Sequence, residues 1–316
     1  MTDATKTREG DGTGGAPGIA YIDNCFVGLA EACIPILDWG FNKSDVVYDG
    51  IPFAKGRIFR LEDHLQRFSE SMRKWRLPAP ALSNSVRDIC HDLVARAGLR
   101  DGIFYICTTR GVPPSAEVRD PTQFNSRFYG WSQEVPRLGS TEQLKNGLNM
   151  IVSEVRRIPE ASVDSTAKNF HWGDLIQARI QAADRGAQNA LLLGSDGNLA
   201  EGVGFNVFVV IDGQLRTPGK DCLRGITRRT VLEIAESEGI EAAVTDIPAL
   251  DLKVATEIFI TSSAGGIFGV TELDGLRVGE GVIGPLTSRI HAEYWRRRVS
   301  DDWSVEVDYD NRRCTE

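Results

Sequence analysis

The chain has 316 residues, of which 41% are hydrophobic and 25% charged, and its formal net charge at pH 7 is −8. This length suits one large or two ordinary domains, and the acidic balance argues against nucleic acid as a partner, because phosphate binding needs a concentrated basic surface. The lack of a long apolar run, of a signal-peptide pattern and of metal-ligand spacing among the six cysteines and four histidines predicts a cytoplasmic protein with small-molecule partners, no membrane contact and no metal centre.

The first part of the chain is expected to alternate short strands with two helices. Residues 1–17 are polar and rich in glycine, which predicts a flexible tail. Beyond them, apolar residues recur at the spacings typical of strands and of amphipathic helices. The expected elements are strands within 20–35 that turn at Asp23-Asn24, more sheet over 37–53, a helix over 61–77 ended by Pro78, a helix over 85–97 capped by Ser83 or Asn84 and followed by Gly98, and strands over 103–109 and 128–131.

Two irregular stretches divide the chain. Residues 110–121 are rich in proline and predict either a surface loop or a lid over substrate. The polar segment 136–147 is expected to link a small N-terminal domain, residues 18–135, to a larger domain over 148–316.

The second part of the chain also mixes strands and helices. The expected elements are strands over 148–155, 190–194, 205–211 and 257–262 and helices over 175–185 and 227–239. Because strands and helices do not alternate regularly as βαβ units, the pattern indicates an α+β fold.

Lys168 is the first candidate for chemistry. It lies in Ser-Thr-Ala-Lys-Asn-Phe-His-Trp-Gly-Asp-Leu, residues 165–175, between small residues and aromatic rings. An amine held beside apolar surface loses its proton more easily, which favours a nucleophile. The common alternative is a lysine that extends to solvent.

Glu201 is the second candidate. It lies in Leu-Ala-Glu-Gly-Val-Gly-Phe-Asn, residues 199–206, just before a strand that is expected to be buried. A buried carboxylate needs a cation or a hydrogen-bond donor, and a protonated ring nitrogen would serve. The alternative is exposure at the edge of a strand.

Three further segments could together hold a phosphate. Arg60 precedes the first helix with a guanidinium that matches phosphate oxygens. Gly225-Ile226-Thr227 opens a helix, whose free N–H groups attract an anion. Ser262 and Ser263 add hydroxyls in a glycine-rich turn. The alternatives are an Arg60–Asp63 ion pair, an ordinary helix cap and a plain bend.

A lysine, an acid and three phosphate-binding segments match one cofactor, pyridoxal 5'-phosphate (PLP). Lys168 would form a Schiff base with it, and Glu201 would face the nitrogen of its ring.

The same segments, in the same order, resemble class IV aminotransferases. They are Phe59-Arg60-Leu61-Glu62-Asp63-His64, Lys168-Asn169-Phe170-His171-Trp172-Gly173-Asp174-Leu175, Glu201-Gly202-Val203-Gly204-Phe205-Asn206, Gly225-Ile226-Thr227-Arg228 and Ser263-Ala264-Gly265-Gly266. Within that family the chain is most similar to the (R)-selective amine transaminases, which share the Lys-Asn-x-x-Trp-Gly-Asp-Leu and Glu-Gly-x-Gly-Phe-Asn patterns. The resemblance extends from about Ala20 to Tyr309.

The resemblance implies a fold type IV PLP enzyme, with a small α/β N-terminal domain and a larger C-terminal pseudo-barrel. It implies a homodimer in which the partner completes each active site. Lys168 would bond to the cofactor and Glu201 would partner its ring nitrogen. The other residues implied to contact the cofactor are Arg60, Ile226, Thr227, Ser262, Ser263 and Trp172.

The implied reaction is ping-pong transamination. An amino group would pass from a primary amine, (R)-configured by the resemblance, to a keto acid such as pyruvate, with Lys168 moving the proton. Related reactions on the same scaffold stay open: an L-branched-chain or D-amino-acid aminotransferase, or an aminodeoxychorismate-type lyase. A PLP-binding protein without enzymatic activity is the alternative outside catalysis.

The expected substrate pocket departs from the (R)-amine enzymes at two positions. Lys43 replaces their usual histidine, and Gly50 replaces their valine or threonine, so that Tyr48-Asp49-Gly50 is closer to the branched-chain aminotransferases. Lys43 could attract a carboxylate or point to solvent, and Gly50 would enlarge the pocket. Ile103, Tyr105 and Ala264 are also expected to line it.

Arg119 is the candidate in the proline-rich loop. It could swing inward to bind the carboxylate of a keto acid. The alternative is a surface pair with Glu117 or Asp120.

Overall fold

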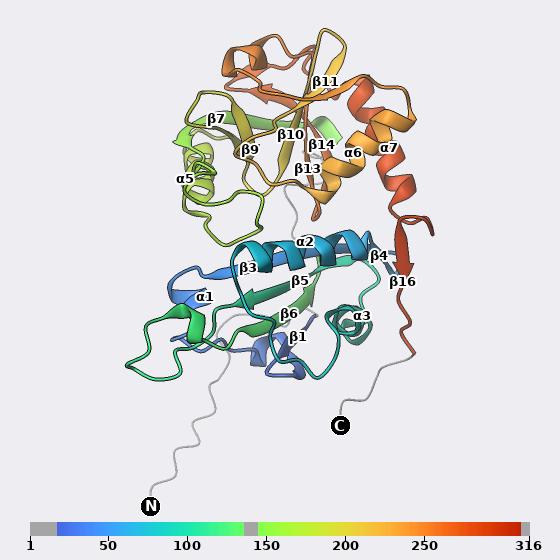
Figure 1. Ribbon diagram of the computed structural model, residues 1–316. Helices are drawn as coiled ribbons and strands as arrows, with labels where there is room; N and C mark the ends of the chain where they lie inside the picture. Colours follow the sequence, from blue (N-terminus) through green and yellow to red (C-terminus); the bar gives the residue numbers. More distant parts are fainter. Residues whose placement is uncertain (1–17, 136–144, 311–316) are drawn as a thin grey trace, which may run out of the picture.

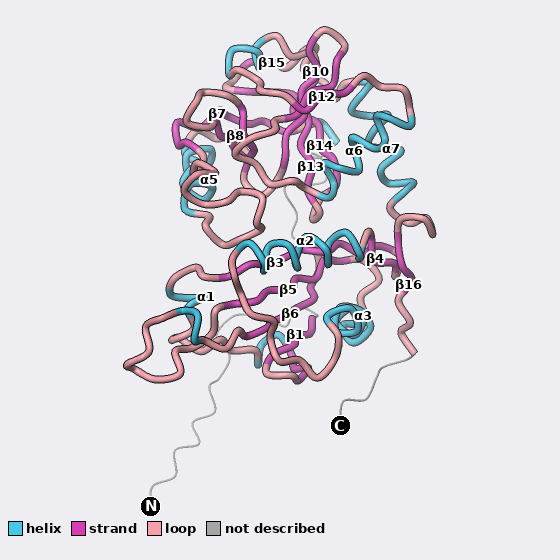
Figure 2. Tube along the Cα trace, viewed as in Figure 1, coloured by secondary structure: helices cyan, strands magenta, loops and turns pink. Residues whose placement is uncertain are grey.

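The computed structural model describes residues 18–135 and 145–310, so the expected tail and most of the expected linker lie outside the described part. Two bodies lie one above the other, each built around its own sheet (Figures 1 and 2). Strands and helices are mixed without βαβ repetition, which agrees with the expected α+β class.

The smaller body holds a seven-stranded sheet in the order β16-β4-β3-β5-β6-β1-β2. Helix α2 lies along β3, near the upper edge of the smaller body in Figure 1. Its elements are β1 (Gly18–Ile22), β2 (Cys25–Gly28), η1 (Leu29–Glu31), α1 (Trp39–Asn42), β3 (Val46–Ala54), β4 (Arg57–Phe59), α2 (Leu61–Lys74), α3 (Val86–Ala97), β5 (Gly102–Thr109), η2 (Pro121–Gln123), β6 (Arg127–Gln133) and β16 (Ser304–Glu306).

Alternation along β3 and β5 gives this sheet two different faces. Val47 and Ile51 of β3 and Ile106 of β5 pack with α2 and α3 in a buried core. Tyr48 follows Val47 on β3, and Tyr105 precedes Ile106 on β5. Both therefore point to the opposite face, where they join a separate aromatic cluster. The aromatic face is the one available to a ligand.

The larger body holds a nine-stranded sheet, in which a bridge between Gly202 and Phe205 brings β9 back beside β10 and curls the sheet into a half-barrel. The strand path is β12-β11-β10-β13-β14-β7-β8-β9, with β15 paired to β14. Its elements are β7 (Leu148–Arg156), α5 (Gly173–Asp184), β8 (Asn189–Leu193), β9 (Leu199–Gly202), β10 (Asn206–Ile211), β11 (Gln214–Thr217), α6 (Ile226–Ser237), β12 (Ala242–Val244), η3 (Ala249–Lys253), β13 (Glu257–Ser262), β14 (Gly266–Leu273), β15 (Leu276–Arg277) and α7 (Pro285–Arg297).

Most expected elements are present, with differences at their ends. Helix α2 begins at Leu61 but ends at Lys74, before Pro78. Ser85, rather than Ser83 or Asn84, caps α3, because its hydroxyl accepts a hydrogen bond from the Asp88 N–H. Gly98 follows α3 in the left-handed conformation.

The C-terminal part of the chain crosses back to the smaller body. Strand β16 pairs antiparallel with β4, so residues 304–306 extend the smaller sheet although they were expected within the domain over 148–316. Among the residues that the structure describes, no helix is both long and apolar enough to cross a membrane.

Candidate active site

A cavity of about 370 Å³ has walls from both bodies. The smaller body contributes side chains from β3, β5 and α2. The larger body contributes the segment around Lys168, the loop after β9, the beginning of α6 and the turn after β13. The expected site residues that line it are Tyr48, Gly50, Ile103, Tyr105, Lys168, Trp172, Glu201, Ile226, Thr227, Ser262, Ser263 and Ala264.

Lys168 is fixed through its backbone to the smaller body. Its carbonyl accepts a hydrogen bond from the Tyr48 N–H at 3.0 Å, and its own N–H donates to the Ser71 hydroxyl at 3.1 Å. Its Nζ lies 4.4 Å from the centre of the Tyr48 ring. Burial, followed by the charge of Arg67, lowers the pKa of Lys168 to about 8. A fraction of the Lys168 amine is therefore neutral near pH 7, and the neutral form is the nucleophile.

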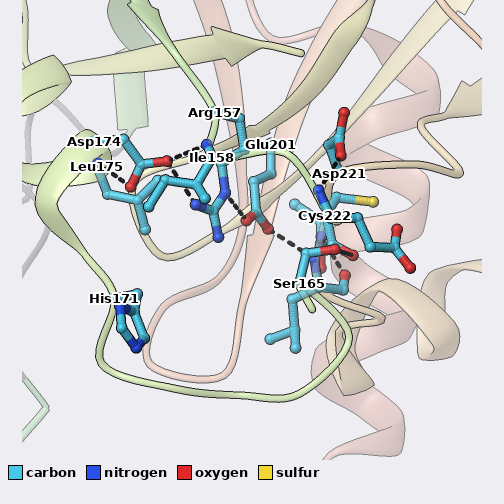
Figure 3. Close-up of polar contacts among 12 residues, drawn as sticks. Arg157, Ile158, Ser165, His171, Asp174, Leu175, Glu201, Asp221 and Cys222 are labelled. Carbon is cyan, nitrogen blue, oxygen red and sulfur yellow. Dashed lines mark hydrogen bonds and ion pairs between the residues drawn. The ribbon is translucent and has the colours of Figure 1, made fainter. Parts of the chain in front are cut away.

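Glu201 lies on β9 as a buried carboxylate with two partners (Figure 3). Its Oε1 accepts from the Arg157 Nε at 2.8 Å and its Oε2 from the Leu223 N–H at 3.0 Å. Burial raises the pKa of Glu201, while the charge of Arg157 opposes that rise. Each carboxylate oxygen can accept more than one hydrogen bond, so Glu201 can still receive a proton donor from the cavity.

Arg157 and Asp174 were not anticipated as site residues. Asp174, in the first turn of α5, accepts from the Arg157 Nη1 at 2.6 Å and from the Ile158 N–H at 2.8 Å. Arg157 therefore lies between two buried carboxylates (Figure 3). The need of a buried Glu201 for a cation was the available signal, but a separation of 44 residues hid which arginine would supply it.

An anion-binding set occupies another wall of the cavity. Helix α6 begins after Gly225 without a side-chain cap, so the N–H groups of Ile226 and Thr227 are not taken up by such a cap. The Thr261 hydroxyl lines the cavity and is buried with no hydrogen-bond partner among the described residues. Ser262 and Ser263 add hydroxyls beside it. Together with the Lys168 amine and a buried carboxylate, these donors fit a phosphorylated pyridine aldehyde.

The expectation that Arg60 holds phosphate is not met, because this side chain lies outside the cavity. Its guanidinium donates to Asp63 and Glu233 and lies 4.7 Å from the centre of the Trp303 ring. Arg67, seven residues further along α2, is the arginine of this helix that lines the cavity.

Arg67 is held in place by a buried carboxylate. Its Nε and Nη2 donate to Asp49 at 2.8 and 2.7 Å, and the neighbouring His64 Nδ1 lies 2.8 Å from the same carboxylate. The charge of Arg67 is the main influence that keeps the pKa of Asp49 well below its usual range, against the effect of burial. Arg60 was the expected phosphate contact and Arg67 was not anticipated, and only their positions in space show which of the two lines the cavity.

Two expected substrate contacts also lie elsewhere. Lys43 and Arg119 are exposed and do not line the cavity. Gly50 does not open extra space, because a Cβ there would lie 2.9 Å from the Tyr105 ring. The Tyr105 ring, stacked on Trp131 at a centroid distance of 4.9 Å, already occupies that volume.

Comparisons with known proteins identify the family. Residues 46–273 match the family model described as "Amino-transferase class IV". A protein of Methanocaldococcus jannaschii, named only as a candidate branched-chain-amino-acid aminotransferase, is 29% identical over 91% of this chain and 98% of its own length. The D-alanine aminotransferase of Listeria monocytogenes is also 29% identical, over 85% of this chain and 92% of its own length.

A comparison with solved structures agrees with this family. The branched-chain amino acid aminotransferase of Thermobaculum terrenum in its PLP form is 25% identical, has a TM-score of 0.80, and is matched over 93% of this chain and 99% of that one. The family match covers well over half of the chain, and the cavity carries a donor set that suits PLP. The chain belongs to the class IV aminotransferases, the PLP-dependent enzymes of fold type IV.

Proposed function

We propose that this aminotransferase moves an amino group between a primary amine, (R)-configured, and a keto acid such as pyruvate. PLP, when bound, supplies an aldehyde that bonds to amines and a ring that withdraws electrons from the substrate carbon. The chain's own residues then have separable roles, which the geometry supports one at a time.

Lys168 acts as nucleophile and as the proton carrier. Its amine lies inside the cavity with a lowered pKa, so it can both give up and accept a proton near neutral pH. Glu201 holds a proton at the ring nitrogen, and Arg157 keeps its carboxylate oriented for that contact. The phosphate is held by the N–H groups of Ile226 and Thr227 and by the neighbouring hydroxyls.

Five residues complete the proposed phosphate and ring contacts. Arg67 supplies the positive charge that Arg60 was expected to supply. Ser262, Ser263 and Thr261 offer hydroxyls, and Trp172 packs beside Gly204 on the loop after β9.

The wall of the cavity that β3 and β5 form is the main support for an uncharged amine as substrate. Its contributions to the cavity are Tyr48, Gly50, Ile103 and Tyr105, none of which is charged. A carboxylate placed against this wall would lose its hydration without gaining a cation, which is costly, so the carboxylate of the keto acid would have to face another wall of the cavity, where Arg179 lies. An aryl or alkyl group would instead bury apolar surface there.

A homodimer is part of the proposal. Ile34, Ile36, Leu37 and Phe41, which we call the N-terminal patch, are between 53% and 74% exposed within one short segment. Such a concentration of exposed apolar side chains is typical of an interface. Lys43 lies two residues after Phe41 and outside this chain's own cavity, so in the proposed dimer it would approach a cavity only across that interface. The five described cysteines are free thiols, which supports the expected cytoplasmic location.

The deciding experiment is a donor panel with pyruvate as acceptor. The panel tests (R)-1-phenylethylamine, its (S)-enantiomer and L-leucine with pyruvate, whereas D-alanine is paired with 2-oxoglutarate. The donors are compared by kcat/KM. We expect the (R)-amine to exceed its enantiomer by at least about 100-fold, a difference of roughly 3 kcal/mol in transition-state binding. Lys168→Ala serves as the inactive control.

The D-amino-acid and branched-chain reactions are the rivals. The names of the relatives favour them, and the segment Tyr48-Asp49-Gly50 is compatible with them. If D-alanine or L-leucine is the best donor and both phenylethylamines react slowly, the proposal of an amine substrate is wrong. The assignment of Lys168 fails separately if Lys168→Ala keeps wild-type turnover.

A further inference from the structure

Arg60 lies at the corner where β4 leads into α2 and where the smaller body meets α6. The preceding residue, Phe59, is buried in the core of the larger body together with Val231 and Ile234 of α6. This apolar contact anchors the corner against the helix whose first turn forms the anion-binding wall. Arg60, the next residue, adds polar contacts to the same helix.

A chain of hydrogen bonds leads from Arg60 to the first residue of α6. The Arg60 Nη1 donates to the Thr230 hydroxyl at 3.1 Å, and this hydroxyl donates to the Ile226 carbonyl at 2.9 Å. The Arg60 guanidinium also donates to Glu233 at 2.5 and 3.1 Å. Ile226, Thr230 and Glu233 are four and three residues apart, so they share one face of α6.

A second ion pair reinforces the first. Arg229 of α6 pairs with Asp63 of α2 at 2.5 Å, and Asp63 also accepts from Arg60. We call Arg60, Asp63, Arg229 and Glu233 the corner cluster. The Arg60 side chain is only 11% exposed, so its contacts are less screened by solvent than those of a surface pair.

Helix α2 gives the corner cluster a second connection to the cavity, through Arg67. Arg60 immediately precedes the helix and Arg67 lies two turns along it, where it lines the cavity. The cluster thus fixes the beginning of α6 against the helix that carries Arg67. The proposed phosphate contacts come from both bodies, with the N-terminus of α6 in one and Arg67 in the other, and this cluster joins the two.

We propose that the corner cluster sets the spacing between the α6 N-terminus and Arg67, and that Arg60 thereby controls affinity for the cofactor's phosphate without touching it. Arg60 is then a positioning residue. The inference rests on the phosphate site proposed above.

The test compares two ligands that differ only in the phosphate. Apoprotein is titrated with PLP and with pyridoxal, which lacks the phosphate, and dissociation constants are taken from the absorbance change. The variants are Arg60→Met, which removes the cluster's central cation, and Glu233→Gln, which removes its partner on α6. Arg57→Met is the matched control, because Arg57 lies three residues earlier and pairs with Asp301 near the C-terminus.

We expect Arg60→Met and Glu233→Gln each to weaken PLP binding by about fivefold and to leave pyridoxal binding unchanged. Their double variant should weaken it by little more than either alone, because both break the same contact. Arg57→Met should change neither ligand.

Three results would overturn the proposal in distinguishable ways. If Arg60 touched the phosphate directly, Glu233→Gln would strengthen PLP binding by removing a competing carboxylate. If the cluster served only folding, both ligands would lose affinity equally. If wild-type apoprotein showed no preference for PLP over pyridoxal, the phosphate site itself would be wrong, and the inference with it.

Discussion

Lys168 is subject to opposing electrostatic influences, and its chemistry depends on their balance. Burial and the charge of Arg67 favour the neutral amine, whereas Asp49 and Glu201 favour the ammonium. Burial dominates, and the pKa falls to about 8. The neutral fraction in the folded apoprotein should therefore rise tenfold per pH unit up to about pH 8 and then level off.

Acetylation by acetic anhydride tests this, since only the neutral amine reacts. The rate of acetylation at Lys168 is followed by peptide mass spectrometry from about pH 6 to about pH 11. This range includes the ordinary pKa of a lysine. The same chain unfolded in urea is the control, and its rate should keep rising to about pH 10.4. A folded-state plateau at that higher pH would contradict the lowered pKa.

At the scale of elements, Arg157 ties three of them together. It follows β7, and its guanidinium pairs with Asp174 of α5 and with Glu201 of β9. Replacing it by methionine would leave two buried carboxylates without their cation. Arg157→Met should destabilise the protein by about 3 kcal/mol, measured from urea unfolding.

A surface ion pair supplies the comparison for Arg157. Arg185 pairs with Glu154, and the two side chains are 42% and 76% exposed. Arg185→Met should therefore cost less than about 1 kcal/mol. Equal losses in the two variants would mean that burial does not give Arg157 its importance.

The sequence predicted elements well where a local signal existed. The spacing of apolar residues located α2, and the turn residues Asp23 and Asn24 joined β1 to β2, where both have positive φ. Strand β16 was not anticipated, because its pairing with β4 lies far away in the sequence. No local pattern encodes such a partner.

The same limit applied to the site. Lys168, Glu201 and the beginning of α6 carry short recognisable motifs, and all three line the cavity. Arg60 was expected at the phosphate and Arg67 was overlooked, because no local pattern shows which of these arginines faces the cavity. Their roles depend on where α6 lies, and that position is fixed by long-range packing around Phe59.

At the scale of the whole molecule, the cavity depends on how its two bodies are held. Tyr48 and Lys168 join them through the backbone at the free edge of β3, and the corner cluster joins them at the beginning of α2. The N-terminal patch projects from the smaller body and has no comparable partner among the residues that the structure describes. In the proposed homodimer, a second copy of the chain would cover it.

Changing the patch should therefore alter assembly and activity together. The variant Ile36→Ser/Phe41→Ser removes two side chains that are 74% and 67% exposed, so it should leave folding intact. We expect sedimentation to show at least a tenfold weaker dimer, equivalent to about 1.4 kcal/mol, and kcat to fall with the dimer fraction. Leu250→Ser, at a side chain 72% exposed on η3, should leave both unchanged. A fully active monomer would show that each cavity is complete within one chain, and Lys43 would then have no part in substrate binding.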